Sequence, residues 1–225
     1  MIADIALEFC ARGGKRLRPR LCKAAFEAAS GVPASGDGIR ALCEAVECFH
    51  KASLIHDDIQ DCDEERYGRP TVWKEHGVAL AIAAGDWLVA HGYGLIAGSG
   101  FPNALEMMKE TLRSHIALCE GQGEDLSPGS PKDDDARYAS ICEKKTGEAF
   151  ALAAALGAMA AGCDPEPYRR YGLAFGKLFQ LRDDISDGEA PGSAKALEPE
   201  FVKGLEECEV AERLGRWHEA HIHTS

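Results

Sequence analysis

The chain has 225 residues, of which 45% are hydrophobic and 7% aromatic, and a formal net charge of −12. This length can bury one hydrophobic core, and no long Ser, Gly or Pro-rich linker divides it, so we expect a single domain over residues 1–225. The negative charge argues against nucleic acids and anionic membranes as general partners, because binding to them requires clustered Lys and Arg side chains.

The cysteines and the apolar runs predict a cytoplasmic protein. The nine cysteines are scattered without CxxC pairs and are odd in number, which favours neither a disulfide framework nor a zinc site. No apolar run reaches the roughly 18 uncharged residues of a membrane span, and the N-terminus lacks a charged-then-apolar signal pattern. We therefore expect reduced thiols and no transmembrane segment.

Apolar residues recur at helical spacing along most of the chain. The predicted helices, in chain order, cover residues 2–11, 17–29, 38–59, 78–97, 104–119, 136–161, 167–185 and 201–217. Glycines, prolines and polar clusters separate them, and we expect loops in the segments GQGEDLSPGSPKDDD and GEAPGSAKALEPE. Because no segment alternates with period two for long enough to form a sheet, the predicted fold class is an all-α helical bundle.

An acidic segment closes the predicted helix 38–59. The stretch SLIHDDIQDCDEERYGRP contains six acidic side chains, and Asp57, Asp58 and Asp61 form a DDxxD motif. Residues i and i+4 share one face of a helix, so Asp57 and Asp61 repel each other unless a cation joins them. Oxygen ligands of this kind suit Mg²⁺, which binds one or two carboxylates and completes its shell with water and phosphate. We expect the other three acids to be solvated loop residues: Asp63, Glu64 and Glu65.

A second copy of the motif, Asp183, Asp184 and Asp187, closes the predicted helix 167–185. One DDxxD is weak evidence, because acidic helix ends are common on solvated surfaces. Two copies at the ends of apolar helices predict that the aspartates face each other across the bundle and clamp metal ions that bind a diphosphate. Helices are rigid elements, which such positioning requires.

Basic side chains could supply directional donors to the same diphosphate. The candidates are Lys15, Arg16 and Arg18 after a double glycine, Arg66 beyond the first acidic motif, and Lys145 with Thr146. For the segment GGKRLRP taken alone, an ordinary solvated helix start is the alternative explanation.

Six blocks together resemble the trans-polyprenyl (isoprenyl) diphosphate synthases: GGKRLRPRL, HKASLIHDDIQDCDEERYGRPTVW, AAGDWLVAHGY, EGQGEDL, KKTGEAF and GKLFQLRDDISD. They occur in the family's order over residues 13–187. The resemblance implies an all-α bundle around a deep cavity, usually a homodimer, with two or three Mg²⁺ ions bound with the diphosphate. It also implies a reaction in which an allylic diphosphate ionises and isopentenyl diphosphate attacks the cation head-to-tail, giving a longer trans-polyprenyl diphosphate.

The family motifs imply roles for individual residues. The direct metal ligands would be Asp57, Asp61 and Asp183, and further ligands or orienting groups would be Asp58, Asp184 and Asp187. Contacts to the allylic diphosphate are implied for Arg66, Lys145, Thr146 and Lys195. Gln180 would lie near the reacting centre. The isopentenyl diphosphate site would comprise Lys15, Arg18 and His50, and His56 would only be supportive.

Two departures from the family pattern bear on activity. The family usually has two consecutive arginines after the first acidic motif, and here the second is Tyr67, which cannot offer a charged fork. The chain is also shorter than typical members, and after Asp187 it lacks the usual GKxxGxD and GKxT segments. Three hypotheses stay open: an active prenyltransferase, a weakly active or inactive diphosphate-binding subunit of a two-component synthase, or another class I enzyme that ionises diphosphates.

Product length in this family depends on the side chains one or two turns before the first acidic motif, which form the floor of the cavity. Ala52 and Ser53 are small, whereas Phe49 is large and is expected one turn deeper. We therefore predict a product longer than C15.

Overall fold

The computed structural model describes residues 1–128, 134–188, 190–214 and 217–221, without the side chains of Ala194 and Lys195. The first part of the chain forms α1 (Ile2–Ala11), α2 (Leu17–Ser30) and α3 (Asp37–Gln60), followed by a hairpin of β1 (Glu65–Arg66) and β2 (Arg69–Pro70). The middle forms α4 (Val72–His76), α5 (Val78–Ala97) and α6 (Ala104–Asp125). The last part forms α7 (Asp135–Ile141), the π-helix η2 (Cys142–Gly147), α8 (Glu148–Ala160), α9 (Glu166–Asp187), α10 (Ala194–Glu206) and α11 (Trp217–His221).

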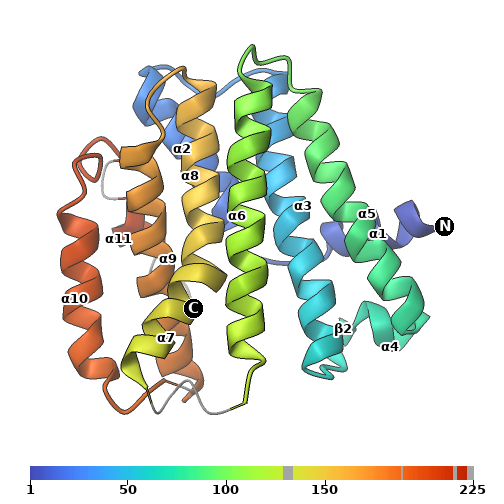
Figure 1. Cartoon of the computed structure of the whole chain (residues 1–225). Helices are drawn as coiled ribbons and strands as arrows, with labels where there is room; N and C mark the ends of the chain where they lie inside the picture. The colour runs from blue at the N-terminus through green and yellow to red at the C-terminus, as the bar shows by residue number, and fades with distance from the viewer. Residues whose placement is uncertain (129–133, 189, 215–216, 222–225) are drawn as a thin grey trace.

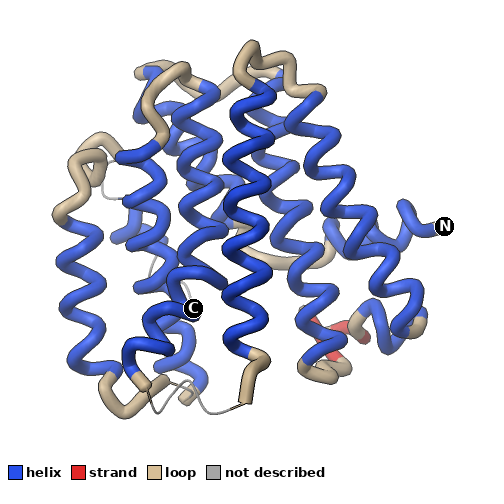
Figure 2. The backbone as a smooth tube through the Cα atoms, in the orientation of Figure 1, coloured by secondary structure: helices blue, strands red, loops and turns tan. Residues whose placement is uncertain are grey.

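The predicted all-α fold class is confirmed. Within the described residues, strands are limited to the one short hairpin (Figure 2). The long helices stand side by side in a bundle (Figure 1). α8 packs against both α2 and α9, while α3 packs against α5. Nearly every residue of α8 is buried, and its alanine-rich sequence suits this position because small side chains let neighbouring helices approach closely.

The contact between α2 and α8 depends on Gly157. A Cβ atom at this position would lie 2.2 Å from the carbonyl oxygen of Cys22 and 2.9 Å from the Cβ of Ala25, both in α2. Non-bonded carbon atoms are normally about 3.5–4 Å apart. Only glycine therefore lets the two helix backbones come this close.

Two predicted boundaries in the middle of the chain are wrong. The helix predicted over 136–161 is divided into α7, η2 and α8, with the wider π turn at Cys142–Gly147. The helix predicted to end at residue 119 continues to Asp125, into the segment that was expected to be a loop. The guanidinium of Arg137 donates to the carbonyl oxygen of Glu124 at 2.8 Å and so satisfies part of the open helix end.

The last long helix begins earlier than predicted. α10 spans Ala194–Glu206 rather than 201–217, and its first residues lie in a segment that was also expected to be a loop. Leu197, Phe201 and Leu205 follow at intervals of four residues and pack against the core formed by α8 and α9. The apolar periodicity therefore starts before residue 201.

The hairpin after the first acidic motif has a two-residue turn. β1 and β2 pair antiparallel with Arg66 opposite Arg69, which leaves Tyr67 and Gly68 as the turn residues. Their φ angles are 56° and 71°. Positive φ at both positions is the pattern of type I′ turns, where Asn or Asp commonly precedes Gly. It is uncommon for a bulky residue such as Tyr67.

Among the described residues, one helix passes the length and composition test for a membrane span, although the sequence analysis expected none. α5 is long and apolar enough to cross a membrane by length and composition, with a mean hydropathy of 1.3, although Asp86 interrupts it. The core helix of a soluble protein passes the same test, so this property alone does not indicate a membrane span. Of the 18-residue apolar part of α5 that passes the test, only 33% is buried within the chain.

Candidate active site

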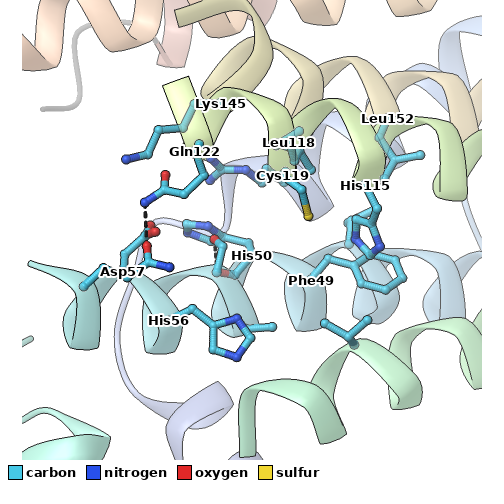
Figure 3. A pocket seen from close by; sticks show the side chains of 18 of the residues that line it. Phe49, His50, His56, Asp57, His115, Leu118, Cys119, Gln122, Lys145 and Leu152 are labelled. Carbon is cyan, nitrogen blue, oxygen red and sulfur yellow. Dashed lines mark hydrogen bonds between the residues drawn. The ribbon is translucent and has the colours of Figure 1, made fainter. Parts of the chain in front are cut away.

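A cavity of about 580 Å³ lies between α3, α5, α6 and the start of α8 (Figure 3). Its polar end contains Asp57 and Lys145. The side-chain amide of Gln122 donates to Gln60 at 2.7 Å and joins α6 to α3 at the same end. From there the cavity extends between the helices toward Phe49, so it combines a charged end with an apolar interior.

Aromatic side chains close the apolar end. The rings of Phe49 and His115 meet edge to face with centroids 4.5 Å apart, and Leu152 lies beside them (Figure 3). The hydroxyl of Tyr93 is hydrogen-bonded to His115 Nδ1 at 2.8 Å. Burial lowers the pKa of His115 to about 4, so the imidazole is neutral at physiological pH. This end of the cavity therefore contains no charged group from these side chains.

The first acidic motif contains two different environments. Burial, reinforced by Asp61, raises the pKa of Asp57, and Lys145 acts in the opposite direction. Asp58 is fully buried, and its Oδ1 accepts a hydrogen bond from Nε of Arg66. Asp57 and Asp61 are thus available to a cation, whereas Asp58 holds the guanidinium of Arg66 in place.

The second acidic motif is divided in a similar way. The side-chain amide of Gln180 donates to Asp184 Oδ1 at 2.7 Å, and the hydroxyl of Tyr138 donates to its Oδ2 at 2.5 Å. Thr146 donates in turn to Gln180 Oε1 at 2.6 Å. Both carboxylate oxygens of Asp184 therefore accept hydrogen bonds from neighbouring side chains. Burial, reinforced by Asp187, raises the pKa of Asp183.

The two motifs end α3 and α9 at the same end of the bundle (Figure 1). A lysine lies near each of them. Lys145 donates to Asp125 at 2.8 Å; burial opposes its charge, but Asp125 and Asp57 together raise its pKa. The pKa of Asp183 is raised overall, and the charge of Lys15 opposes that rise. Each motif is thus within the electrostatic reach of a lysine, which suits the binding of a diphosphate together with cations.

The carboxylates fit Mg²⁺ by their donor chemistry. Asp61 lies one helical turn from Asp57 and raises its pKa, and Asp187 lies one turn from Asp183 and does the same there. Among the described residues, no group of three or more His, Cys, Asp or Glu side chains could enclose a metal ion. Paired carboxylates suit Mg²⁺, which uses one or two protein carboxylates and completes its shell with water and substrate phosphates.

Comparison with known proteins places this geometry in a family. Residues 1–199 match the family model described as polyprenyl synthetase. The chain belongs to the polyprenyl synthetase family. It is 35% identical over 216 residues to a short chain isoprenyl diphosphate synthase of Methanothermobacter thermautotrophicus, covering 91% of this chain and 64% of that protein. It is 36% identical over 190 residues to a geranylgeranyl diphosphate synthase of Methanosarcina mazei, covering 80% and 56%.

The fold of this member of the polyprenyl synthetase family is similar to a solved one. It superposes on the crystal structure of an isoprenoid synthase family member from Thermotoga neapolitana with a TM-score of 0.83 and 26% identity, covering 96% of this chain and 88% of that chain. The chain spans 54–64% of the length of the curated relatives that it matches.

Three residues are predicted from the family motifs to bind isopentenyl diphosphate: Lys15, Arg18 and His50. Arg18 and His50 line the cavity, whereas Lys15 is exposed on the turn before α2. Arg18 stacks on Phe150 at 4.5 Å, and burial lowers its pKa to about 10, so it keeps its charge at neutral pH. Burial and the charge of Arg18 lower the pKa of His50 well below its usual value. The imidazole is therefore neutral.

The remaining predicted residues differ in their surroundings. Lys195 lies in the first turn of α10, but its side chain lies outside the described residues. His56 also lines the cavity, where it packs closely on Gly85 of α5 and lies 3.7 Å from Asp86. The three acids expected to be solvated are all exposed: Asp63, Glu64 and Glu65.

Sequence analysis missed two residues that hold predicted site residues in place. Tyr138 binds Asp184, and Asp125 binds Lys145. Asp125 belongs to the block EGQGEDL, which was recognised as a family block but was expected to form a loop. Nothing in the local sequence indicates that α6 extends to Asp125.

Proposed function

We propose that the chain is a prenyltransferase that condenses an allylic diphosphate with isopentenyl diphosphate head-to-tail to give a longer trans-polyprenyl diphosphate. The observation that carries this proposal is the cavity, which has Asp57 and Lys145 at one end and Phe49 and Leu152 at the other. A prenyl diphosphate divides its polarity in the same way. The synthase names of the relatives support the same reaction.

The allylic diphosphate would bind with its phosphates at the shared end of α3 and α9. Two or three Mg²⁺ ions, held by Asp57, Asp61 and Asp183, would supply stabilisation of the negative charge that develops on the leaving diphosphate. Lys145, fixed by Asp125, and Arg66, fixed by Asp58, would donate directional hydrogen bonds to the same group. Both cations are oriented before substrate arrives, so little reorganisation opposes ionisation.

The prenyl chain would occupy the apolar end of the cavity. Phe49, Leu152 and neutral His115 present no charge that would attract water. A carbocation reacts readily with water, so a dry surface protects it until the second substrate attacks. Arg18 and His50 on the cavity wall, with Lys15 on the turn before α2, would hold the isopentenyl diphosphate.

The test is incubation of the purified protein with Mg²⁺, labelled isopentenyl diphosphate and a C5, C10 or C15 allylic diphosphate. An elongated prenyl diphosphate is the expected product. If none of the three allylic diphosphates is elongated, the proposal is contradicted. Release of diphosphate without isopentenyl diphosphate would instead indicate another class I ionising enzyme.

Product length should respond to Ala52. This residue lines the cavity and is almost fully buried, so Ala52→Phe is expected to shorten the main product by at least one C5 unit. Phe49→Ala is the matched opposite change and should lengthen the product beyond the wild-type value, which we predict to exceed C15. Chromatography of the dephosphorylated products measures both effects, and an unchanged product distribution in both variants would reject this placement of the cavity floor.

We also propose that two copies of the chain pair through α5 and α6. Large apolar side chains are exposed on both helices: Val78, Ile82, Leu105, Leu112 and Ile116. The partner would cover apolar residues of α5, because only 33% of its 18-residue apolar part is buried within the chain. Such an apolar face on adjacent helices is typical of interaction sites.

All nine cysteines are free, which is consistent with a reducing compartment such as the cytoplasm.

The paired state can be tested by introducing charge on this face. Ile116→Glu, at a residue that is 61% exposed, is expected to convert a dimer to a monomer in analytical ultracentrifugation. Val32→Glu is the control, because Val32 is similarly exposed at 54% but lies in the loop after α2. Equal sedimentation of wild type and Ile116→Glu would argue against this interface.

A further inference from the structure

The turn of the hairpin lies against the double glycine of the N-terminal basic segment. A Cβ atom at Gly13 would lie 2.9 Å from Cγ of Tyr67, and one at Gly14 would lie 3.3 Å from the Tyr67 hydroxyl oxygen. Both glycines have positive φ, 29° and 95°. The chain can therefore pass Tyr67 at this distance only as a glycine backbone.

A buried lysine joins these two segments. Lys51 of α3 has 0% of its surface exposed. Its Nζ donates to the carbonyl oxygens of Arg12 at 2.7 Å and of Gly13 at 3.2 Å, and it lies 4.3 Å from the centroid of the Tyr67 ring. An ammonium group has three donors and is costly to bury unless they are satisfied. Two carbonyl groups and one aromatic face meet that requirement.

The backbone of Tyr67 indicates that this contact determines its conformation. Its φ of 56° is unfavourable for an aromatic residue and persists only when the surrounding contacts fix it. The ring supplies those contacts by lying between the ammonium of Lys51 and the backbone of Gly13 and Gly14. The contacts with Lys51 and Gly13 are made by the ring and do not require the hydroxyl group.

We propose that Lys51 and Tyr67 are positioning residues that hold the turn at Gly13–Gly14 and thereby fix Lys15 and Arg18 for the second diphosphate. Lys15 directly follows the held turn, and Arg18 extends from the first turn of α2 into the cavity. Lys51 also places a positive charge beside the position where the family usually has a second arginine. The identity of that ligand as isopentenyl diphosphate depends on the proposed function.

The first test needs no substrate. Trypsin cleaves after lysine and arginine, so the rate of cleavage after Lys15 and Arg16, both exposed, reports how firmly the turn is held. Lys51→Met and Tyr67→Leu are expected to raise this rate about tenfold, because each removes a contact of the order of 1.4 kcal/mol. Tyr67→Phe keeps the ring and should stay within about twofold of wild type.

Lys74→Met is the matched control for the lysine change. Lys74 also lies near an aromatic ring, 5.8 Å from the centroid of Trp73, but its side chain is exposed. The rate of cleavage at the turn should not change in this variant. If Lys51→Met does not fold, Tyr67→Leu carries the test, because Tyr67 is 41% exposed. Unchanged cleavage in the variants that fold overturns the proposal.

The second test separates the two substrates. Calorimetry with Mg²⁺ should show that Tyr67→Leu binds isopentenyl diphosphate about tenfold more weakly, whereas affinity for geranyl diphosphate stays within about twofold. Equal weakening of both ligands, or no weakening of either, would overturn the positioning role. Faster cleavage in a protein whose wild type binds no isopentenyl diphosphate would leave the held turn supported and reject the proposed function instead.

A reciprocal change sharpens the result. Tyr67→Arg restores the usual family residue but places a guanidinium beside the ammonium of Lys51, so it is expected to weaken isopentenyl diphosphate binding about tenfold. Adding Lys51→Met removes that repulsion, so it should weaken binding much less in this background than it does in the wild type. Additive effects of the two changes would contradict a direct coupling between residues 51 and 67.

Discussion

Replacing Asp57 with asparagine is expected to lower the rate of the proposed Mg²⁺-dependent condensation by about 10³-fold. Asp57 is the aspartate of the first motif that lines the cavity, and its neighbour one turn later is Asp61. Asparagine keeps the shape of the side chain but cannot supply the negative charge that binds Mg²⁺. Steady-state kinetics at saturating Mg²⁺, with calorimetric titration of Mg²⁺ and inorganic pyrophosphate, measure the loss.

The same substitution is expected to raise the melting temperature of the substrate-free protein at neutral pH. Burial and Asp61 raise the pKa of Asp57 above its unfolded value, so ionisation costs more in the folded state than in the unfolded state. This cost is absent below the unfolded pKa of about 3.9 and appears as the pH rises through the folded pKa. The advantage of the asparagine variant should therefore disappear in acid.

Glu65→Gln is the matched control for both measurements. Glu65 lies in the same acidic stretch but is exposed in β1, outside the cavity. We expect its rate and melting temperature to equal those of the wild type. If both variants lose activity equally, or if Asp57→Asn keeps full activity, Asp57 is not a metal ligand of the reaction.

Gly157→Ala is expected to destabilise the protein by about 3 kcal/mol, because overpacking costs of this size arise where a backbone must move. The added Cβ would lie 2.2 Å from the backbone carbonyl oxygen of Cys22, so α2 and α8 must separate. That separation also disturbs the helix from which Arg18 reaches the cavity. Denaturant unfolding should show a lower midpoint with an unchanged slope.

Gly94→Ala provides the comparison within another helix. A Cβ atom at Gly94 in α5 would meet no atom within 4 Å. The change should stabilise the protein by about 0.5–1 kcal/mol, since alanine favours helix more than glycine does. Equal destabilisation of both variants would show that helix propensity, rather than the α2–α8 contact, explains the effect at Gly157.

Local patterns allowed most of the helices to be predicted. Spacing of apolar residues located the helix cores because one face of each helix is buried, and the structure agrees for α1, α2, α3 and α5 to within one residue. The boundaries that failed depend on contacts between distant segments. Arg137 helps to hold the last turn of α6, and nothing in the sequence around residue 125 indicates that contact.

The sequence by itself determined the fold class, the family and the two acidic motifs at the ends of α3 and α9, because periodicity and motif spacing are properties of neighbouring residues. The roles of the individual carboxylates in metal binding stay predictions. The tertiary structure decided which partner each of these side chains contacts. It directs Asp58 to Arg66 and Asp184 to Tyr138, and it brings Lys51 to Tyr67. Such partners cannot be read from sequence, because burial and charge pairing depend on which distant segments pack together.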